Sequence, residues 1–176
     1  MTDKVKKEIE KLIKKLNLNC SIEQFKDKVD WYYISEYQKL SEDFIREFQD
    51  KVKWDWISMF QKLSEDLIRE FQNKIDWYNI SYHQKLSEDF IREFKNKVDW
   101  MNISIFQQLS ENFIREFEGK INWFLISASQ TLSEDFIKEF EEKLDLDYLL
   151  KKHKISQDFY NFLIYEKVNR FELMDI

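Results

Sequence analysis

Apolar side chains recur along this chain with the spacing of short amphipathic helices. Residues 28–50 read KVDWYYISEYQKLSEDFIREFQD, and the same pattern returns without a break at residues 51–73, 74–96, 97–119 and 120–142. Every copy has 23 residues. A strict period in the range of about 20–50 residues is typical of a repeat array rather than of one globular core.

Each copy predicts two short helices joined by a tight turn. In the first copy, one helix covers about residues 31–38 and follows Asp30, whose carboxylate can cap the free N–H groups of the first turn. The other covers about residues 42–51 and follows Ser41, and a serine recurs there in every copy. Only the second copy has a poor first cap, because Lys53 takes the position of Asp30.

The second helix has a single apolar face. In the first copy it carries Phe44, Ile45 and Phe48, and the charged residues between them are predicted to face solvent. Helices this short are marginal alone in water, and one hairpin cannot bury its own apolar face. Stacked hairpins can, and the chain has one glycine and no proline for β-turns. We therefore expect an all-α fold, an α-solenoid of stacked two-helix hairpins with 23 residues per repeat.

No linker separates the copies, so we expect a single repeat domain over residues 1–176. Residues 1–27 form an imperfect first unit, with an amphipathic helix whose apolar side is flanked by lysines. Such helices bind membranes or calmodulin-like grooves, but repeat arrays also need soluble caps, and we interpret this unit as the N-terminal cap. Residues 143–176 are predicted to be a decayed sixth copy and C-terminal cap helix, in which His153 takes the position of the repeated Gln38.

Comparison of the five regular copies separates constant positions from changing ones. A tryptophan, an isoleucine, a serine and a glutamine return in every first helix, with the i, i+3, i+4, i+7 spacing of one helix face. In the first copy they are Trp31, Ile34, Ser35 and Gln38. The small serine lets a neighbouring helix approach. The glutamine side chain can hydrogen-bond the adjacent turn, whose backbone groups would otherwise be unpaired.

The changing positions form the variable face of the array, nearly opposite the constant face at about 100° per residue. Its members are Tyr32, Tyr33, Glu36 and Tyr37; Asp55, Trp56, Met59 and Phe60; Tyr78, Asn79, Tyr82 and His83; Met101, Asn102, Ile105 and Phe106; and Phe124, Leu125, Ala128 and Ser129. Solenoids read partners on the face that their architecture leaves free, and Tyr, Trp, Phe and Met are enriched at protein interfaces. Two other interpretations are that this face packs inside the array or that it joins copies of the chain.

These patterns predict a non-enzymatic helical-repeat scaffold that binds another protein, of unknown identity, through the variable face. Because the central copies would present the middle of the array, the site is expected to centre on Trp56, Met59, Phe60, Tyr82, His83 and Phe106. The alternative is a self-assembling structural protein, a homo-oligomer that uses the same face for contacts between its own copies.

Charge and composition narrow the choice of partner. Residues 1–27 carry a net charge of +2 and residues 28–142 carry −8, within a total of −6. An acidic repeat body argues against nucleic acid as a partner, because backbone phosphates require a basic track. No apolar run approaches about 18 residues, so we expect no transmembrane helix and no membrane partner. The single Cys20 fits a reducing, intracellular compartment.

No catalytic or metal-binding constellation is recognisable in the sequence. Its two histidines, His83 and His153, lack a cysteine or an acidic companion at metal-ligand spacing. Phosphate-binding loops and nucleophile motifs are also missing. We therefore expect no enzymatic activity, no cofactor and no metal.

The repeats resemble tandem-repeat proteins encoded by giant DNA viruses of amoebae. The resemblance spans about residues 29–137 and rests on the pattern W-x-x-I-S-x-x-Q-x-L-S-E-D-F-I-R-E-F, as in the strings YYISEYQKLSEDFIREFQDKV and WYNISYHQKLSEDFIREF. It implies a viral origin and a role inside an infected cell, in the host cytoplasm. It implies no particular biochemical activity.

Overall fold

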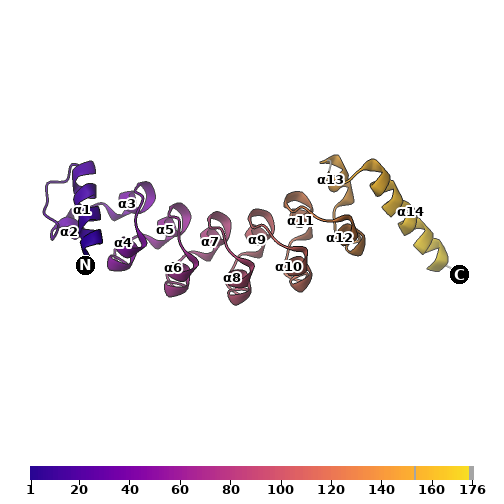
Figure 1. Ribbon diagram of the computed structural model, residues 1–176, viewed down its shortest axis with the longest axis horizontal. Helices are drawn as coiled ribbons and strands as arrows, with labels where there is room; N and C mark the ends of the chain where they lie inside the picture. Colours follow the sequence, from indigo (N-terminus) through magenta and orange to yellow (C-terminus); the bar gives the residue numbers. More distant parts are fainter. Residues whose placement is uncertain (153, 175–176) are drawn as a thin grey trace. The chain divides into compact units, whose positions relative to one another are not determined.

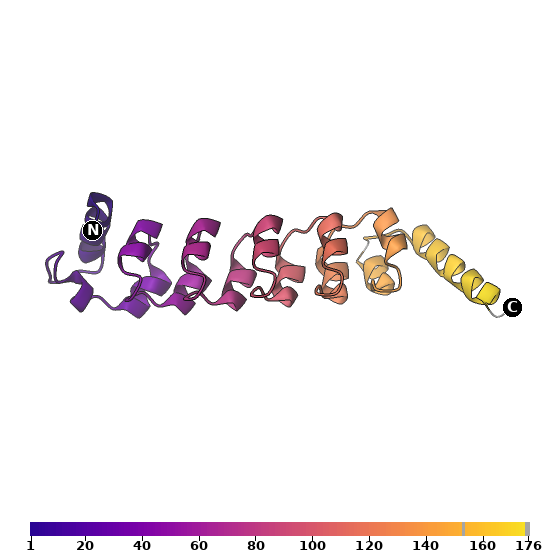
Figure 2. The same ribbon diagram turned by 90° about the horizontal axis from the view of Figure 1, so that it is seen from below.

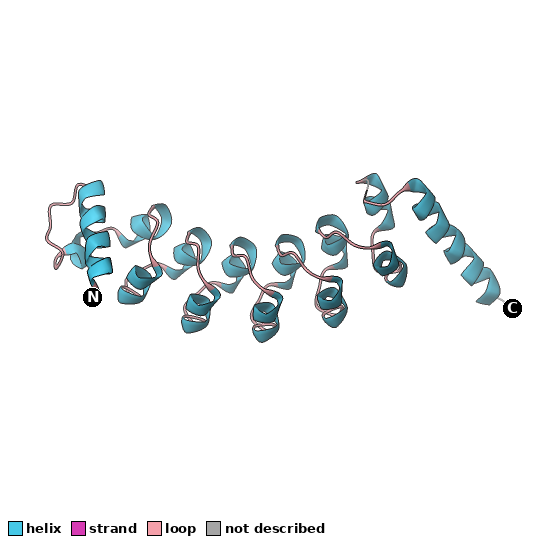
Figure 3. Ribbon diagram, in the orientation of Figure 1, coloured by secondary structure: helices cyan, strands magenta, loops and turns pink. Residues whose placement is uncertain are grey.

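The computed structural model describes residues 1–152 and 154–174, with side chains as far as residue 167. All regular structure in this part of the chain is helical, and Figure 3 shows no strand. The helices alternate in pairs that follow the 23-residue period. This arrangement confirms the predicted all-α fold, a solenoid of two-helix hairpins.

Fourteen helices are present in the described residues. Their bounds are α1 (Asp3–Lys15), α2 (Phe25–Lys28), α3 (Trp31–Tyr37), α4 (Glu42–Glu47), α5 (Trp54–Phe60), α6 (Glu65–Glu70), α7 (Trp77–His83), α8 (Glu88–Glu93), α9 (Trp100–Phe106), α10 (Glu111–Glu116), α11 (Trp123–Ser129), α12 (Glu134–Glu139), α13 (Leu146–Lys151) and α14 (Gln157–Met174).

Two compact units make up the chain, Met1–Leu86 with α1 to α7 and Ser87–Ile176 with α8 to α14. In the first unit, α3, α5 and α7 lie side by side in one row and α4 and α6 lie in another (Figure 1). In the second unit, α9, α11 and α13 form one row and α8, α10 and α12 the other. Within each unit the hairpins follow one another in chain order (Figure 2).

Hydrogen bonds at the helix starts confirm the predicted caps. The Ser41 hydroxyl accepts the backbone N–H of Phe44 at 3.2 Å, and the serine of every other regular copy caps its helix in the same way. The Asp30 carboxylate accepts the N–H of Tyr33 at 3.1 Å, whereas Lys53 provides no side-chain cap. A cap is worth about 1 kcal/mol, so the caps specify where the short helices begin, with two in every regular copy except the second.

The second helices are shorter than predicted. Helix α4 ends at Glu47, about one turn early, because Phe48 leaves helical geometry and packs its ring on Trp31 with centroids 5.1 Å apart. The carbonyl oxygen of Gln49 then accepts the indole N–H of Trp54 at 2.8 Å. The same indole bond recurs in the other regular copies. The tryptophan that opens each regular hairpin is therefore bonded to the segment that precedes it.

The core of each unit lies between its two rows of helices. In the first regular hairpin, Ile34, Phe44 and Ile45 are buried, and the corresponding side chains of the other regular copies are equally enclosed. Aromatic rings line this layer, with Phe44 and Phe48 centroids 4.7 Å apart. The apolar spacing of the second helix therefore identified the buried face correctly.

Within each unit, the repeated glutamine joins a hairpin to the one before it. The side-chain amide of Gln61 donates to the carbonyl oxygens of Ser35 and Gln38 at 2.9 and 2.8 Å. Its own carbonyl oxygen accepts the N–H of Leu40 at 3.0 Å. These backbone groups belong to the turn between α3 and α4, where the end of a helix leaves them without helical partners. The expected bond from the glutamine to the adjacent turn is confirmed.

The repeated serine makes a second link between hairpins. The hydroxyl of Ser58 accepts the N–H of Asp76 at 3.0 Å and donates to the carbonyl oxygen of Trp54 at 2.7 Å. Because Asp76 caps α7, the buried hydroxyl connects one first helix to the start of the next. Gln84 and Gln130 repeat the glutamine contacts inside their own units.

Charged side chains tie the second helices together at the surface. The Glu42 carboxylate accepts the N–H of Ser64 in the next hairpin at 2.8 Å and also pairs with Arg46 at 3.4 Å. Arg46 in turn reaches Glu70 of the next hairpin at 2.7 Å. The arginines at this position are half-buried, so the sequence-based view that they simply face solvent is wrong. Arg46, Arg92 and Arg115 each bridge two second helices of their own unit.

The last hairpin replaces the glutamine with a lysine. The Lys154 ammonium group donates to the carbonyl oxygens of Ser127, Ala128 and Gln130 at 3.0, 2.8 and 2.9 Å. Burial lowers the pKa of this ammonium group from its ordinary value. His153, which the sequence aligned with the glutamine, lies outside the described residues. Lys154, the residue after His153, therefore donates hydrogen bonds to the turn that follows α11.

Phe90→Ala should lower the free energy of unfolding by about 3–5 kcal/mol, because the ring is fully buried and its removal leaves a cavity. Phe106→Ala is the matched control, since it is the same substitution at a ring that is 44% exposed. It should cost less than about 1 kcal/mol. Urea denaturation of the two variants measures both values, and equal losses would contradict the assignment of faces.

Gln61→Ala should destabilise the chain by about 3 kcal/mol or more, because it leaves three buried backbone groups unpaired at about 1–3 kcal/mol each. Gln108→Ala, in an exposed turn, serves as the control and should change stability by less than about 0.5 kcal/mol. The same denaturation experiment compares them. A small loss for Gln61→Ala would mean that water replaces the side-chain amide.

Candidate functional site

The structure brings together five of the six residues predicted to form the site. Trp56, Met59 and Phe60 lie on α5, and Tyr82 and His83 lie on α7 beside it. Phe106 lies on α9, which belongs to the second unit. Five of the six residues therefore belong to the first unit, and Phe106 belongs to the variable face of the second.

Most of the predicted site side chains are open to solvent. Met59, Phe60 and Tyr82 are 37%, 45% and 39% exposed, His83 is also exposed, and Trp56 is half-buried. The constant face of the same helices is buried, with the repeated isoleucine and serine of each regular copy fully enclosed. The helix thus has one face that holds the array together and one that presents large side chains outward.

Four tyrosines that the prediction left out belong to the same surface. Tyr32, Tyr33 and Tyr37 on α3 are 58%, 43% and 61% exposed, and Tyr78 on α7 is exposed to 59%. The sequence contained the signal, because all four occupy variable positions of the first and third copies. The prediction omitted them because it assumed that the middle of the array would form the site.

Aromatic side chains on the same helix contact one another on this surface. The Tyr33 and Tyr37 centroids lie 5.1 Å apart, and the rings of Trp56 and Phe60 are nearly parallel at 5.6 Å. Both pairs have the i, i+4 spacing that brings side chains together on a helix. The pairs restrict side-chain motion before any partner arrives, so less conformational entropy is lost on binding.

A groove runs between the C-terminal ends of adjacent first helices. In the first unit it has a volume of about 340 Å³ and is lined by Glu36, Tyr37, Gln38, Lys39, Leu40, Phe60, Gln61 and Lys62. The equivalent groove of the second unit, about 290 Å³, is lined by the same eight positions, residues 105–109 and 129–131. The stacking of the first helices therefore forms the groove in both units, and the residues that differ between copies give each groove its charge and polarity.

The two grooves differ in what they offer a ligand. The first has two aromatic rings, Tyr37 and Phe60, and two lysines at its turns. The second retains one ring, Phe106, and has the neutral Gln108 and Thr131 in place of the lysines. A partner with apolar side chains and carboxylates therefore matches the first groove better.

Local charges act on two of the exposed tyrosines. The Glu36 carboxylate raises the pKa of the Tyr37 phenol above its ordinary value, by a hydrogen bond and by its charge. The Lys53 ammonium lies over the Tyr32 ring, 4.5 Å from its centroid. A cation over an aromatic face is attracted by the ring quadrupole. Both rings are therefore engaged by neighbouring charged side chains.

The variable face is not open at every position. In the second unit Asn102 is buried and Ile105 is half-buried on α9. Part of the variable face of α9 is therefore closed to solvent. The tyrosine-rich first unit is the part of this face with the larger exposed aromatic surface.

Comparison of the chain with protein-family models, with curated proteins and with solved structures found no match in any of the three. Among the described residues, no group of three or more His, Cys, Asp or Glu side chains is arranged to hold a metal ion. Within the same part of the chain, no helix has the length and apolar character required to cross a membrane.

The double variant Phe60→Ser and Tyr82→Ser should keep its melting temperature within about 3 °C of the wild type, because both rings are largely exposed. Leu67→Ser places a hydroxyl in the fully buried core of the same unit and should lower the melting temperature by much more. Thermal unfolding followed by circular dichroism compares the two. A similar fall in both would show that the variable face is structural packing.

Proposed function

We propose that this chain is a non-enzymatic helical-repeat scaffold that binds another protein through the variable face of α3, α5 and α7. The observation that carries the proposal is the row of exposed aromatic side chains on these helices, opposite a buried face that is nearly constant. Exposed apolar surface has a free-energy cost in water, and a contiguous patch of it is typical of an interaction site.

The area of this surface fits a standard protein interface. Seven large side chains are more than about a third exposed: Tyr32, Tyr33, Tyr37, Met59, Phe60, Tyr78 and Tyr82. At about 200 Å² for a full side chain, their exposed parts sum to roughly 700 Å². One partner of a standard interface contributes about 800 Å². The variable face of the first unit alone can therefore supply most of one side of such an interface.

The chemistry of the surface also favours a protein partner. Tyrosine combines a large rigid ring with a hydroxyl group, so it buries apolar area and forms hydrogen bonds at a low entropic cost. Nucleic acid is a poorer match, because the repeat body carries a net charge of −8. As part of this proposal we infer a viral origin and a location in the host cytoplasm, which the resemblance of the repeats supports.

A second candidate function is self-assembly through the same face, which the same exposed rings support. The two functions differ in what happens to the purified chain as its concentration changes. Light scattering over a concentration series should give the mass of a monomer throughout if the face is reserved for another protein. If the mass rises with concentration, and if the double variant Phe60→Ser with Tyr82→Ser no longer shows this rise, the face would be assigned to contacts between copies of the chain instead.

The partner itself is sought by capture from a host-cell lysate with the immobilised chain, followed by mass spectrometry. Phe60→Ser with Tyr82→Ser should lose the captured protein. The matched control is Phe162→Ser with Tyr165→Ser, the same two substitutions at rings 43% and 68% exposed on α14. This control should retain the partner. Loss of capture in both variants, or in neither, would refute the proposed site.

A further inference from the structure

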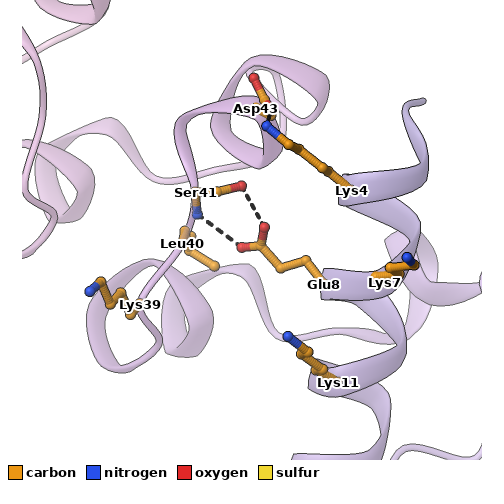
Figure 4. Close-up of a pocket in the computed structure, with 8 residues that line it drawn as sticks. All are labelled: Lys4, Lys7, Glu8, Lys11, Lys39, Leu40, Ser41 and Asp43. Atoms are coloured by element: carbon orange, nitrogen blue, oxygen red, sulfur yellow. Dashed lines mark hydrogen bonds and ion pairs between the residues drawn. The ribbon is translucent and has the colours of Figure 1, made fainter.

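A second groove lies on the first unit, between α1 and the turn that joins α3 to α4 (Figure 4). Its volume is about 530 Å³, which is larger than that of either groove between the first helices. Its lining residues are Lys4, Lys7, Glu8, Lys11, Lys39, Leu40, Ser41 and Asp43. Four of these eight residues are lysines, so the groove is basic within a chain that is acidic as a whole.

The two acidic residues of the groove are already paired. Figure 4 shows Glu8 reaching from α1 to Ser41, where its carboxylate accepts the backbone N–H at 2.9 Å and also the hydroxyl. The Asp43 carboxylate lies 3.9 Å from the Lys4 ammonium. These contacts hold α1 against the hairpin. Because Asp43 is paired with Lys4, the three remaining lysines face one carboxylate, Glu8, and the groove keeps a net positive charge.

Three lysines of the groove keep their charges available. Within the described residues, Lys7, Lys11 and Lys39 make no hydrogen bond or ion pair through their side chains. The regular hairpins differ, because there the corresponding glutamate meets an arginine four residues further on, as Glu42 meets Arg46. The α1 helix therefore carries cations that the architecture does not use.

We propose that this groove binds an extended acidic segment of a partner protein, with its carboxylates on Lys7, Lys11 and Lys39. Lys7 and Lys11 are separated by about 6 Å along the helix axis. Alternate residues of an extended chain are about 7 Å apart. Carboxylates on alternate residues of such a segment can therefore reach both lysines of α1. A further carboxylate can reach Lys39 on the turn, whose side chain is directed away from α1 in Figure 4.

The acidic residues in the wall select this ligand over other anions. A phosphate backbone or an anionic membrane surface presents continuous negative charge, which would meet Glu8 and Asp43 as well as the lysines. A peptide can place neutral residues opposite the two acidic side chains. The buried Leu40 at the base of the groove offers an apolar contact for such a residue.

This inference rests on the proposed function in one respect only, namely that the acidic segment belongs to the protein that the scaffold binds. The groove itself is separate from the exposed aromatic side chains of α3, α5 and α7. Lys39 and Leu40 line both this groove and the aromatic groove next to it. One bound segment can therefore continue from the lysines of α1 to the rings of Tyr37 and Phe60.

The test measures binding of a fluorescent peptide of alternating glutamate and alanine, about ten residues long, to the full chain by anisotropy. Lys7→Gln, Lys11→Gln and Lys39→Gln in one variant should weaken binding by about tenfold or more. The matched control is Lys14→Gln, Lys15→Gln and Lys26→Gln, which removes the same charge from exposed sites outside the groove. It should weaken binding less than about threefold, and both variants are checked for helix content by circular dichroism.

The proposal is supported if the triple variant at Lys7, Lys11 and Lys39 loses peptide affinity and the control variant does not. Peptide binding should also weaken as the salt concentration is raised, as expected for exposed ion pairs. Equal losses in the two triple variants would overturn the proposal, because they would show diffuse attraction rather than a site. Absence of peptide binding would also overturn it, as would groove-dependent binding of phosphatidylserine vesicles without peptide binding. Phe60→Ser with Tyr82→Ser should leave the peptide affinity unchanged, so failure of the groove and failure of the aromatic site are distinguishable.

Discussion

The stacking inside each unit depends on hydrogen bonds from one hairpin to the backbone groups of the hairpin before it. Helices of six or seven residues have few internal hydrogen bonds, and most of their end groups have no helical partner. Gln61 supplies three bonds to one such turn, and Ser58 holds the cap of the next first helix. Because these bonds are buried, a hairpin without its neighbour would leave polar groups unpaired. Stacking is therefore a condition for forming the helices at all.

That constraint explains why one face varies and the other does not. The tryptophan, isoleucine, serine and glutamine of each first helix all contribute to the core or to bonds between hairpins, so a change at any of them affects a neighbouring repeat. The variable positions make few such contacts. They can carry any side chain that solvent or a partner accepts, and in the first unit they carry mainly tyrosine, phenylalanine and methionine.

The sequence predicted the fold well because its signals are local and repeated. Caps, apolar spacing and period each pointed to the same hairpin, and the copies confirmed one another. The ends of the second helices were missed because Phe48 keeps the apolar spacing of the helix although its backbone lies outside helical geometry. The solvent exposure of each variable position also could not be predicted from the repeat pattern. Asn102 is buried and Tyr37 is exposed, although both occupy variable positions.

The turn at Lys39 and Leu40 connects the two candidate binding surfaces. The N–H of Leu40 is held by Gln61 from the side of α5, and the N–H of Ser41 is held by Glu8 from the side of α1. Both walls are thus fixed by hydrogen bonds before a ligand binds. A segment with an apolar residue followed by spaced carboxylates would meet rings on one side of this turn and lysines on the other. The bonds that assemble the array therefore also position the turn that the two proposed binding surfaces share.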